Sequence, residues 1–184
     1  MLPPGDSYDA IRAAFRWRVP ERYNIGVDCC DKWADGSGRL ALLHRREDGG
    51  TERITFDALR ARTNRLANTL RAHGIGRGDR VAVLLPQVPE TAVAHLAAFK
   101  LGAISVPLFQ LFGEQALEFR LRDCGAAALV TDATGSAKLS SIRDGLPDLR
   151  AVFAVDGPND GAFDLAALVE RASDAFEPAD TAAD

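Results

Sequence analysis

Apolar and polar positions follow two periods along this chain, and each period predicts one kind of element. The clearest helical pattern covers residues 56–72, where apolar or small side chains recur every third or fourth position. Polar side chains occupy the opposite side, as in an amphipathic helix. Thr55 is expected to cap the first turn, and Gly74 is expected to end the helix in a left-handed turn.

From residue 80 onward, short apolar runs alternate with longer helical patterns. The apolar runs predict strands at 80–85, 103–108, 127–131 and 151–155. The segments after them predict helices at 89–101, 114–124, about 136–145 and 164–172. Strands that alternate with helices are typical of an α/β fold, in which a mostly parallel sheet is flanked by helices on both faces.

The residues before this alternation predict helices at 7–17 and 24–34, with Ser7 and Asn24 as caps. Two apolar runs, 40–46 and 51–54, flank an Asp-Gly-Gly turn and predict a hairpin. Trp17 and Trp33 lie on the two helices and are expected to pin them to the rest of the protein.

These patterns divide the chain into three parts. Residues 1–53 are expected to form N-terminal helices and a hairpin that pack on the main domain. Residues 54–173 form the parallel α/β subdomain, and the acidic, alanine-rich residues 174–184 read as a linker.

Composition and charge exclude several partners. Hydrophobic residues make up 47% and charged residues 26% of the 184, the profile of a soluble globular protein. The formal net charge is −4 and no extended Lys/Arg cluster occurs, which argues against nucleic acid as a partner. The most apolar window, 92–113, is interrupted by His95, Lys100, Gly102 and Pro107, so no membrane span is expected.

Three cysteines, two of them adjacent, suggest neither a disulfide framework nor a metal site, and a reducing cytoplasm is the expected location.

The stretch HGIGRGDRVAVLLP, residues 73–86, carries Gly74, Gly76 and Gly78 at alternate positions. Such glycines either cradle a phosphate or turn the chain. A phosphate loop follows a strand and opens a helix, so that free N–H groups face the anion. Here the glycines follow a helix and precede a strand, which favours the turn.

No residue type or spacing reveals a catalytic centre or a metal site. His95 lies in a helix that is apolar nearly all round, which favours a packed, hydrogen-bonded histidine over a catalytic base. Cys124 is expected to be a small buried side chain. A dinucleotide-binding domain is disfavoured because no strand is followed by G-x-G-x-x-G.

Three stretches, in order, resemble the N-terminal region of the adenylate-forming enzymes, which include acyl-CoA synthetases, peptide-synthetase adenylation domains and luciferases. Residues 54–90 resemble the pattern [ST]-[YF]-x-x-L, N-x-x-A-x-x-L, G-[IV]-x-x-G-D-x-V-[AG]. Residues 94–108 resemble the K-x-G-A-x-x-x-P signature, and 117–132 are similar to the helix and strand that follow. The segments NIGVDCCDKWA and LFQLFG look most like acyl-CoA synthetases of the acetate and medium-chain type.

This resemblance implies the N-terminal subdomain of the acyl-CoA synthetase-like fold. It also implies an AMP-forming ligase that uses ATP, Mg²⁺ and CoA to convert a carboxylic acid, such as a fatty acid, into a thioester. The family's phosphate loop, T-S-G-T-T-G-x-P-K, does not occur in these 184 residues. We therefore expect an N-terminal portion of a longer enzyme that docks on the remainder, binds none of these cofactors tightly and is inactive alone. The alternative is a non-catalytic interaction or regulatory module on the same scaffold.

The resemblance also implies three positions on the CoA path. Gly113, with Phe112 beside it, matches the glycine-containing turn near the pantetheine chain. Lys138 is the nearest basic residue that matches a contact to the nucleotide phosphate of CoA. The simpler interpretations are a loop glycine before a helix and an ordinary solvated lysine.

Overall fold

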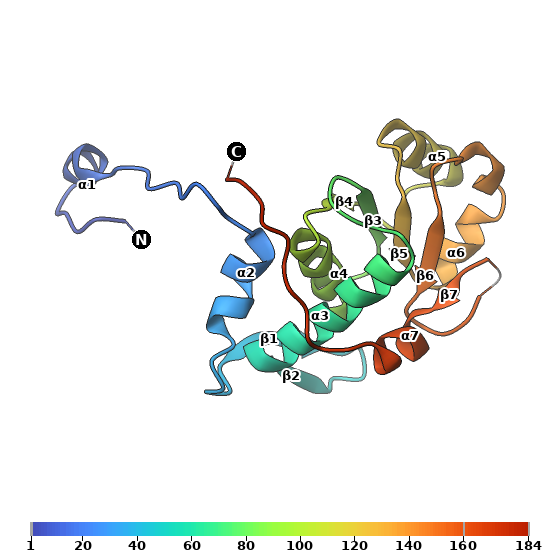
Figure 1. Ribbon diagram of the computed structural model, residues 1–184, viewed down its shortest axis with the longest axis horizontal. Helices are drawn as coiled ribbons and strands as arrows, with labels where there is room; N and C mark the ends of the chain where they lie inside the picture. The colour runs from blue at the N-terminus through green and yellow to red at the C-terminus, as the bar shows by residue number, and fades with distance from the viewer. Residues whose placement is uncertain (1, 160, 184) are drawn as a thin grey trace.

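The structure is a computed structural model that describes residues 2–159 and 161–183 (Figure 1). Its helices are α1 (Tyr8–Ala14), α2 (Ile25–Cys29), α3 (Phe56–Ala72), α4 (Pro89–Lys100), α5 (Glu114–Asp123), α6 (Ala133–Leu139) and α7 (Leu165–Arg171), with 3-10 turns η1 (Asp31–Trp33) and η2 (Arg143–Gly145). Its strands are β1 (Leu40–Arg45), β2 (Thr51–Thr55), β3 (Arg80–Leu84), β4 (Ile104–Pro107), β5 (Ala128–Thr131), β6 (Ala151–Ala154) and β7 (Phe163–Asp164).

Within the described residues, the main sheet has five parallel strands in the order β4-β3-β5-β6-β7 (Figure 1). The strand order reverses between β3 and β5, because the chain first moves outward to β4 and then crosses back. Residues of β3, β5 and β6 alternate between two apolar clusters, so these three strands are buried on both faces. Val81 and Val83 belong to the cluster that contains α3, α4 and α7. Ala82 and Leu84 belong to the cluster with α5 and α6, which confirms the predicted fold class.

The long helix and the turn after it follow the local sequence signals. Thr55 Oγ1 accepts a hydrogen bond from the Ala58 N–H at 3.2 Å, so Thr55 is the predicted cap of α3. Gly74 has φ +76°, and the Ile75 N–H reaches back to the Leu70 carbonyl at 3.1 Å. The glycines therefore close a helix and lead into β3, as predicted, and they do not open a helix.

Two charged residues fix the entrance to β3. Arg80 donates from Nε to the Cys124 carbonyl at 2.6 Å and from its guanidinium to the Gly125 carbonyl. Asp79 pairs with Arg150 at 2.7 Å and accepts a hydrogen bond from the Gly76 N–H at 2.8 Å. The start of the central strand is thus bound to the end of α5 and to the segment before β6.

Three predicted helices are shorter than expected. The helix expected at 7–17 is α1, which ends at Ala14. The pattern at 136–145 is helix α6 at Ala133–Leu139, followed by the separate turn η2. It begins earlier because Asp132 Oδ1 accepts from the Gly135 N–H at 2.9 Å and caps it. The helix expected at 24–34 ends at Cys29, and the chain then turns through η1.

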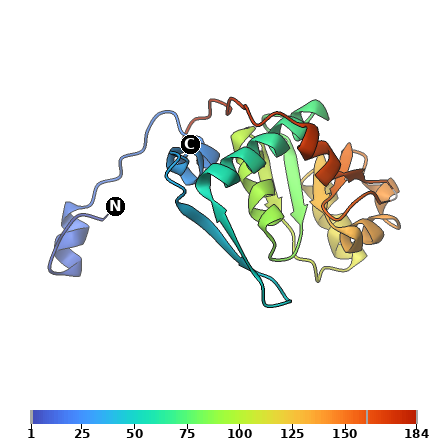
Figure 2. The same cartoon turned by 90° about the horizontal axis from the view of Figure 1, so that it is seen from below.

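The two tryptophans differ in their surroundings. Trp33 packs near Phe56 at 6.3 Å and under the Arg39 guanidinium at 4.5 Å, so it joins its turn to α3. The expectation for Trp17 is wrong, because its side chain is 83% exposed and contacts Phe15 within its own segment. Helix α1 buries no residue and stands apart from the body in both views (Figures 1 and 2).

The predicted hairpin is present, and β1 pairs antiparallel with β2. Its turn projects from the body in Figure 2, and Leu43 is 60% exposed. The boundaries proposed at residues 53 and 173 stay predictions.

The contact between α6 and β5 gives a stability prediction. A Cβ on Gly135 would collide with Thr131 Oγ1, a buried group that donates to the Leu84 carbonyl at 3.0 Å. Gly135→Ala gains about 1 kcal/mol in helix propensity, but overpacking costs about 1–3 kcal/mol. We expect a net loss of stability in urea unfolding.

Gly76→Ala is the matched control, because no atom lies within 4 Å of its Cβ position and its φ is not positive. It should leave stability unchanged or raise it by about 0.4–1 kcal/mol. Equal effects of the two substitutions would contradict the packing argument.

Candidate functional site at the carboxyl edge of the sheet

The carboxyl ends of β3, β4 and β5 lie at one edge of the sheet, where the strand order reverses. In open α/β sheets, ligands bind outside this edge near such a reversal. The loop after β4 and the first turn of α6 meet there. Gln110 from the loop donates from Nε2 to Asp132 Oδ2, at the end of β5, at 2.7 Å.

The structure brings together the three residues predicted from the resemblance. Lys138 Nζ donates to the carbonyl oxygens of Gln110 at 2.5 Å and Phe112 at 3.1 Å. Gly113 follows directly and is the residue before α5. Lys138 is therefore not an ordinary solvated lysine, since it holds the loop in place through backbone carbonyls. Within the part of the chain that the structure describes, no carboxylate pairs with it.

Gly113 borders an open pocket of about 570 Å³, which Glu114, Gln115, Ala116 and Lys138 also line. Its φ of −74° is available to any residue, so the backbone does not require glycine here. No atom lies within 4 Å of its Cβ position, so a side chain would project into free space. The first N–H groups of α5 have no side-chain cap, and they add positive potential beside the Lys138 ammonium.

The Phe112 ring contacts other residues than Lys138. The Arg120 guanidinium lies 4.1 Å from its centroid, and Phe109 meets it edge-on at 6.0 Å. Phe112 thus contributes its carbonyl to the site, and its ring anchors the loop to α5.

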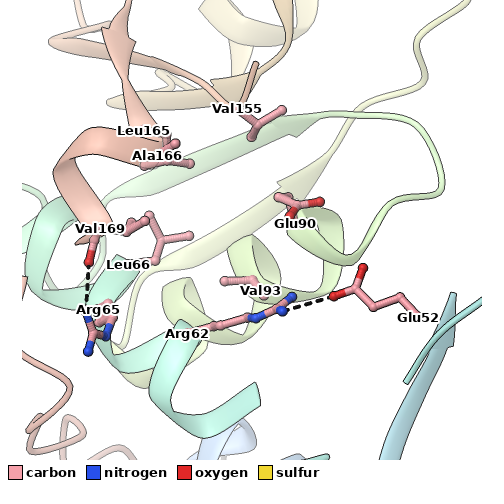
Figure 3. A pocket seen from close by; sticks show the side chains of 10 residues that line it. All are labelled: Glu52, Arg62, Arg65, Leu66, Glu90, Val93, Val155, Leu165, Ala166 and Val169. Atoms are coloured by element: carbon pink, nitrogen blue, oxygen red, sulfur yellow. Dashed lines mark hydrogen bonds and ion pairs between the residues drawn. The ribbon is translucent and has the colours of Figure 1, made fainter. Parts of the chain in front are cut away.

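A second pocket, of about 310 Å³, lies between α3, α4 and α7 (Figure 3). Its apolar part is made by side chains such as Leu66, Val93 and Val169. At its rim, Arg62 pairs with Glu52 at 3.0 Å. The lining of this pocket does not combine a charged group with a Ser, Thr, Cys or Lys nucleophile. The sequence offered no signal for the pocket, because its lining residues come from four separate elements.

His95 is a packed histidine, as predicted. Its Nδ1 lies 2.6 Å from Ser105 Oγ, and the side chain is half-buried between α4 and β4. Burial lowers the pKa of His95 below its ordinary value of 6.5, because water no longer stabilises the imidazolium. It lies outside both pockets.

No structural role was predicted for Lys100, which entered the sequence analysis only as the lysine of the K-x-G-A-x-x-x-P signature. Its side chain is fully buried, and Nζ lies 2.6 Å from Asp31 Oδ1 and 2.7 Å from both Thr63 Oγ1 and Asn64 Oδ1. Burial lowers the pKa of Lys100, and Asp31 opposes this shift. The neighbouring Cys30 thiol has its pKa raised to about 11, mainly by burial, so it is a poor nucleophile.

Two negative findings apply to residues 2–159 and 161–183. Three or more His, Cys, Asp or Glu side chains nowhere gather closely enough to hold a metal ion. None of the helices described there combines the length and apolar character needed to cross a membrane.

Comparison with known proteins places this doubly wound α/β domain in a family. The model of the AMP-binding enzyme family matches residues 30–183, and the chain belongs to that family. This confirms the resemblance to adenylate-forming enzymes. Curated relatives include acetyl-coenzyme A synthetases from Gemmatimonas aurantiaca, 37% identical over 67% of the chain, and Burkholderia thailandensis, 39% identical over 70%. The matches cover 19% and 20% of those relatives.

Solved structures agree. The Brucella canis acyl-CoA synthetase superposes with a TM-score of 0.86 at 33% identity, over 95% of this chain and 34% of that one. The Mycobacterium tuberculosis fatty acyl CoA synthetase has a TM-score of 0.71 at 30% identity, over 86% and 30%. The chain therefore corresponds to about a fifth of the curated relatives and about a third of these structures.

The buried His95 predicts a pH effect on stability. The unfolded chain protonates this histidine more readily than the folded protein as pH falls through 6.5. Folding stability should therefore decrease in the window below 6.5, down to the lowered pKa of the folded state. His95→Gln should flatten this part of the curve, measured as unfolding free energy against pH. Parallel curves for the two proteins would contradict the assignment.

Proposed function

We propose that this chain forms the N-terminal scaffold of an AMP-forming acyl-CoA synthetase and has no ligase activity by itself. The observation that carries the proposal is the family match over residues 30–183, together with relatives that are synthetases several times as long. In the proposed reaction, a carboxylic acid and Mg-ATP give an acyl-adenylate and pyrophosphate, and CoA thiolate then releases AMP. The phosphate-binding pattern of the family does not occur in these residues, which supports inactivity of the chain alone.

The Gly113 pocket is the proposed passage for CoA. Two features of this chain fit such a ligand: backbone N–H groups at the start of α5 and the unpaired charge of Lys138. Lys138 has two of its three N–H donors engaged by carbonyls, so one remains for a phosphate or a pantetheine carbonyl. Gly113 keeps the passage open because it has no side chain.

The proposed docking partner is the remainder of the enzyme. Several large apolar side chains near the carboxyl edge and β4 are exposed, among them Ile104 at 54%, Phe109 at 60% and Leu111 at 81%. Exposed apolar clusters mark interaction surfaces. Free cysteines at 29, 30 and 124 fit the proposed cytoplasmic location.

A chimera tests the proposed activity. Residues 30–183 replace the matching region of the Gemmatimonas aurantiaca acetyl-coenzyme A synthetase. We expect the chimera to form an acyl-CoA from an acid, ATP and CoA, and the 184-residue chain alone to release no pyrophosphate. A folded but inactive chimera would favour the interaction-module alternative. Turnover by the chain alone would contradict its proposed inactivity.

The CoA passage is tested separately by NMR titration. We expect binding of CoA on the order of millimolar, with shift changes at the amides of 113–116. Lys138→Met should weaken it by up to about fivefold, since an exposed ion pair contributes up to about 1 kcal/mol. Gly113→Leu should weaken it by filling the pocket.

Lys32→Met serves as the control, because that lysine lies on η1 and pairs with Asp28 on α2, away from the loop. Shift changes confined to other amides, or an unchanged affinity of Lys138→Met, would overturn the placement of CoA here.

A further inference from the structure

Residues 173–182, called the strap below, cross the surface of α3 and α4 in an extended path (Figure 1). Helix α3 contacts this path through two asparagines. Asn68 Nδ2 donates to the carbonyls of Ser173 at 2.7 Å and Ala175 at 2.9 Å. Asn64 Nδ2 donates to the carbonyl of Asp174 at 2.8 Å. The contacts are to the strap backbone, so they do not depend on its side chains.

A second anchor lies where the strap passes α2 and the end of α4. Asn24 Nδ2 donates to the Ala179 carbonyl at 3.0 Å, and the Ala179 N–H donates to the Lys100 carbonyl at 2.7 Å. Beyond it, Tyr23 and Thr181 exchange two hydrogen bonds, from the Tyr23 N–H at 2.7 Å and from Thr181 Oγ1 at 2.6 Å. The strap is thereby held at both ends.

In all three asparagines a donor of the folded domain binds the amide oxygen, and the amide nitrogen donates to a strap carbonyl. The Asn24 nitrogen also donates to the Phe99 carbonyl of α4 at 3.0 Å. Asn64 Oδ1 accepts from the buried Lys100 ammonium at 2.7 Å. Asn68 Oδ1 accepts from Arg71 at 2.7 Å, and Asn24 Oδ1 accepts from the Gly26 N–H at 2.9 Å. An ammonium has only donors, so the Asn64 oxygen must face Lys100 and its NH₂ must face the strap.

We propose that Asn24, Asn64 and Asn68 are positioning residues that fix the path of the strap by binding its carbonyl groups. Lys100 sets the orientation of Asn64 and so acts on the strap through it. The surface formed by α2, α3 and α4 thus binds an extended polypeptide, and this chain's own residues 173–182 occupy it. This inference does not rest on the proposed ligase activity, since it concerns the route of the backbone alone.

The test changes asparagine to aspartate, which keeps the acceptor and removes the donor. In Asn68→Asp, the oxygen that binds Arg71 is retained, while the N–H groups toward Ser173 and Ala175 are lost. Asn64→Asp likewise keeps an acceptor for Lys100. We expect at least tenfold faster hydrogen–deuterium exchange of strap amides, Ala179 in particular, in the double variant. The amides of β3 and β5 should exchange as in the unmodified protein.

Gln115→Glu is the matched control, because it makes the same chemical change on the exposed side of α5 and should alter no strap amide. Asn68→Asp alone is the second variant, since this half-buried site leaves the Lys100 cluster intact. It should accelerate strap exchange severalfold even if the double variant fails to fold.

The exposed strap side chains provide a converse test. Ala175→Ser and Glu177→Gln should leave strap exchange within twofold, because the asparagines bind backbone carbonyls and these two side chains are exposed. Unchanged exchange in Asn68→Asp, or a loss of strap protection in the two strap variants, would overturn the proposal.

Discussion

The buried ammonium of Lys100 is the interaction on which the arrangement around the main sheet depends. A charge removed from water costs several kcal/mol unless it is paired and hydrogen-bonded. Here the partners come from two different parts of the chain: Asp31 from η1, and Thr63 and Asn64 from α3. The N-terminal segment, the long helix and α4 must therefore dock together for the charge to be tolerated.

The packing around this lysine leaves little freedom. A Cβ on Gly26 would collide with the Lys100 side chain. The close approach of α2 to α4 therefore requires glycine at position 26. The Lys100 carbonyl then accepts from Ala179. Lys100 thus connects α2 and η1, the long helix α3, and the strap. It does so through side-chain packing, through the bonds of its ammonium and through its backbone carbonyl.

Local signals predicted the elements that depend on neighbouring residues. Thr55, Gly74 and the apolar run of β3 act within a few positions of themselves, and the elements they predicted were confirmed. The failures have different causes. Helix α6 begins directly after its cap, Asp132, and not at about residue 136, where the apolar pattern predicted its start. Trp17 is 83% exposed, and its ring contact is to Phe15 of its own segment. No role was predicted for Lys100, because its partners Asp31, Thr63 and Asn64 lie far away in the sequence.

The candidate site divides in the same way. The resemblance implied that Phe112, Gly113 and Lys138 all belong to the CoA path. It did not imply the bonds from Lys138 to two backbone carbonyls, because such contacts leave no signal in a sequence. The apolar pocket beside α7 was missed for a related reason, since each of its lining residues also suits an ordinary core.

The contacts of Asp79 and Arg80 at the start of β3 have a consequence for the register of the strands. Both faces of this strand are apolar, so sliding it by one position would exchange one apolar set for another at little hydrophobic cost. Apolar burial alone cannot distinguish the correct register from one that is shifted by a single residue. Asp79 and Arg80 can, because a slip would pull each away from its partners. These two charged residues at the start of β3 therefore hold the central strand in a single register.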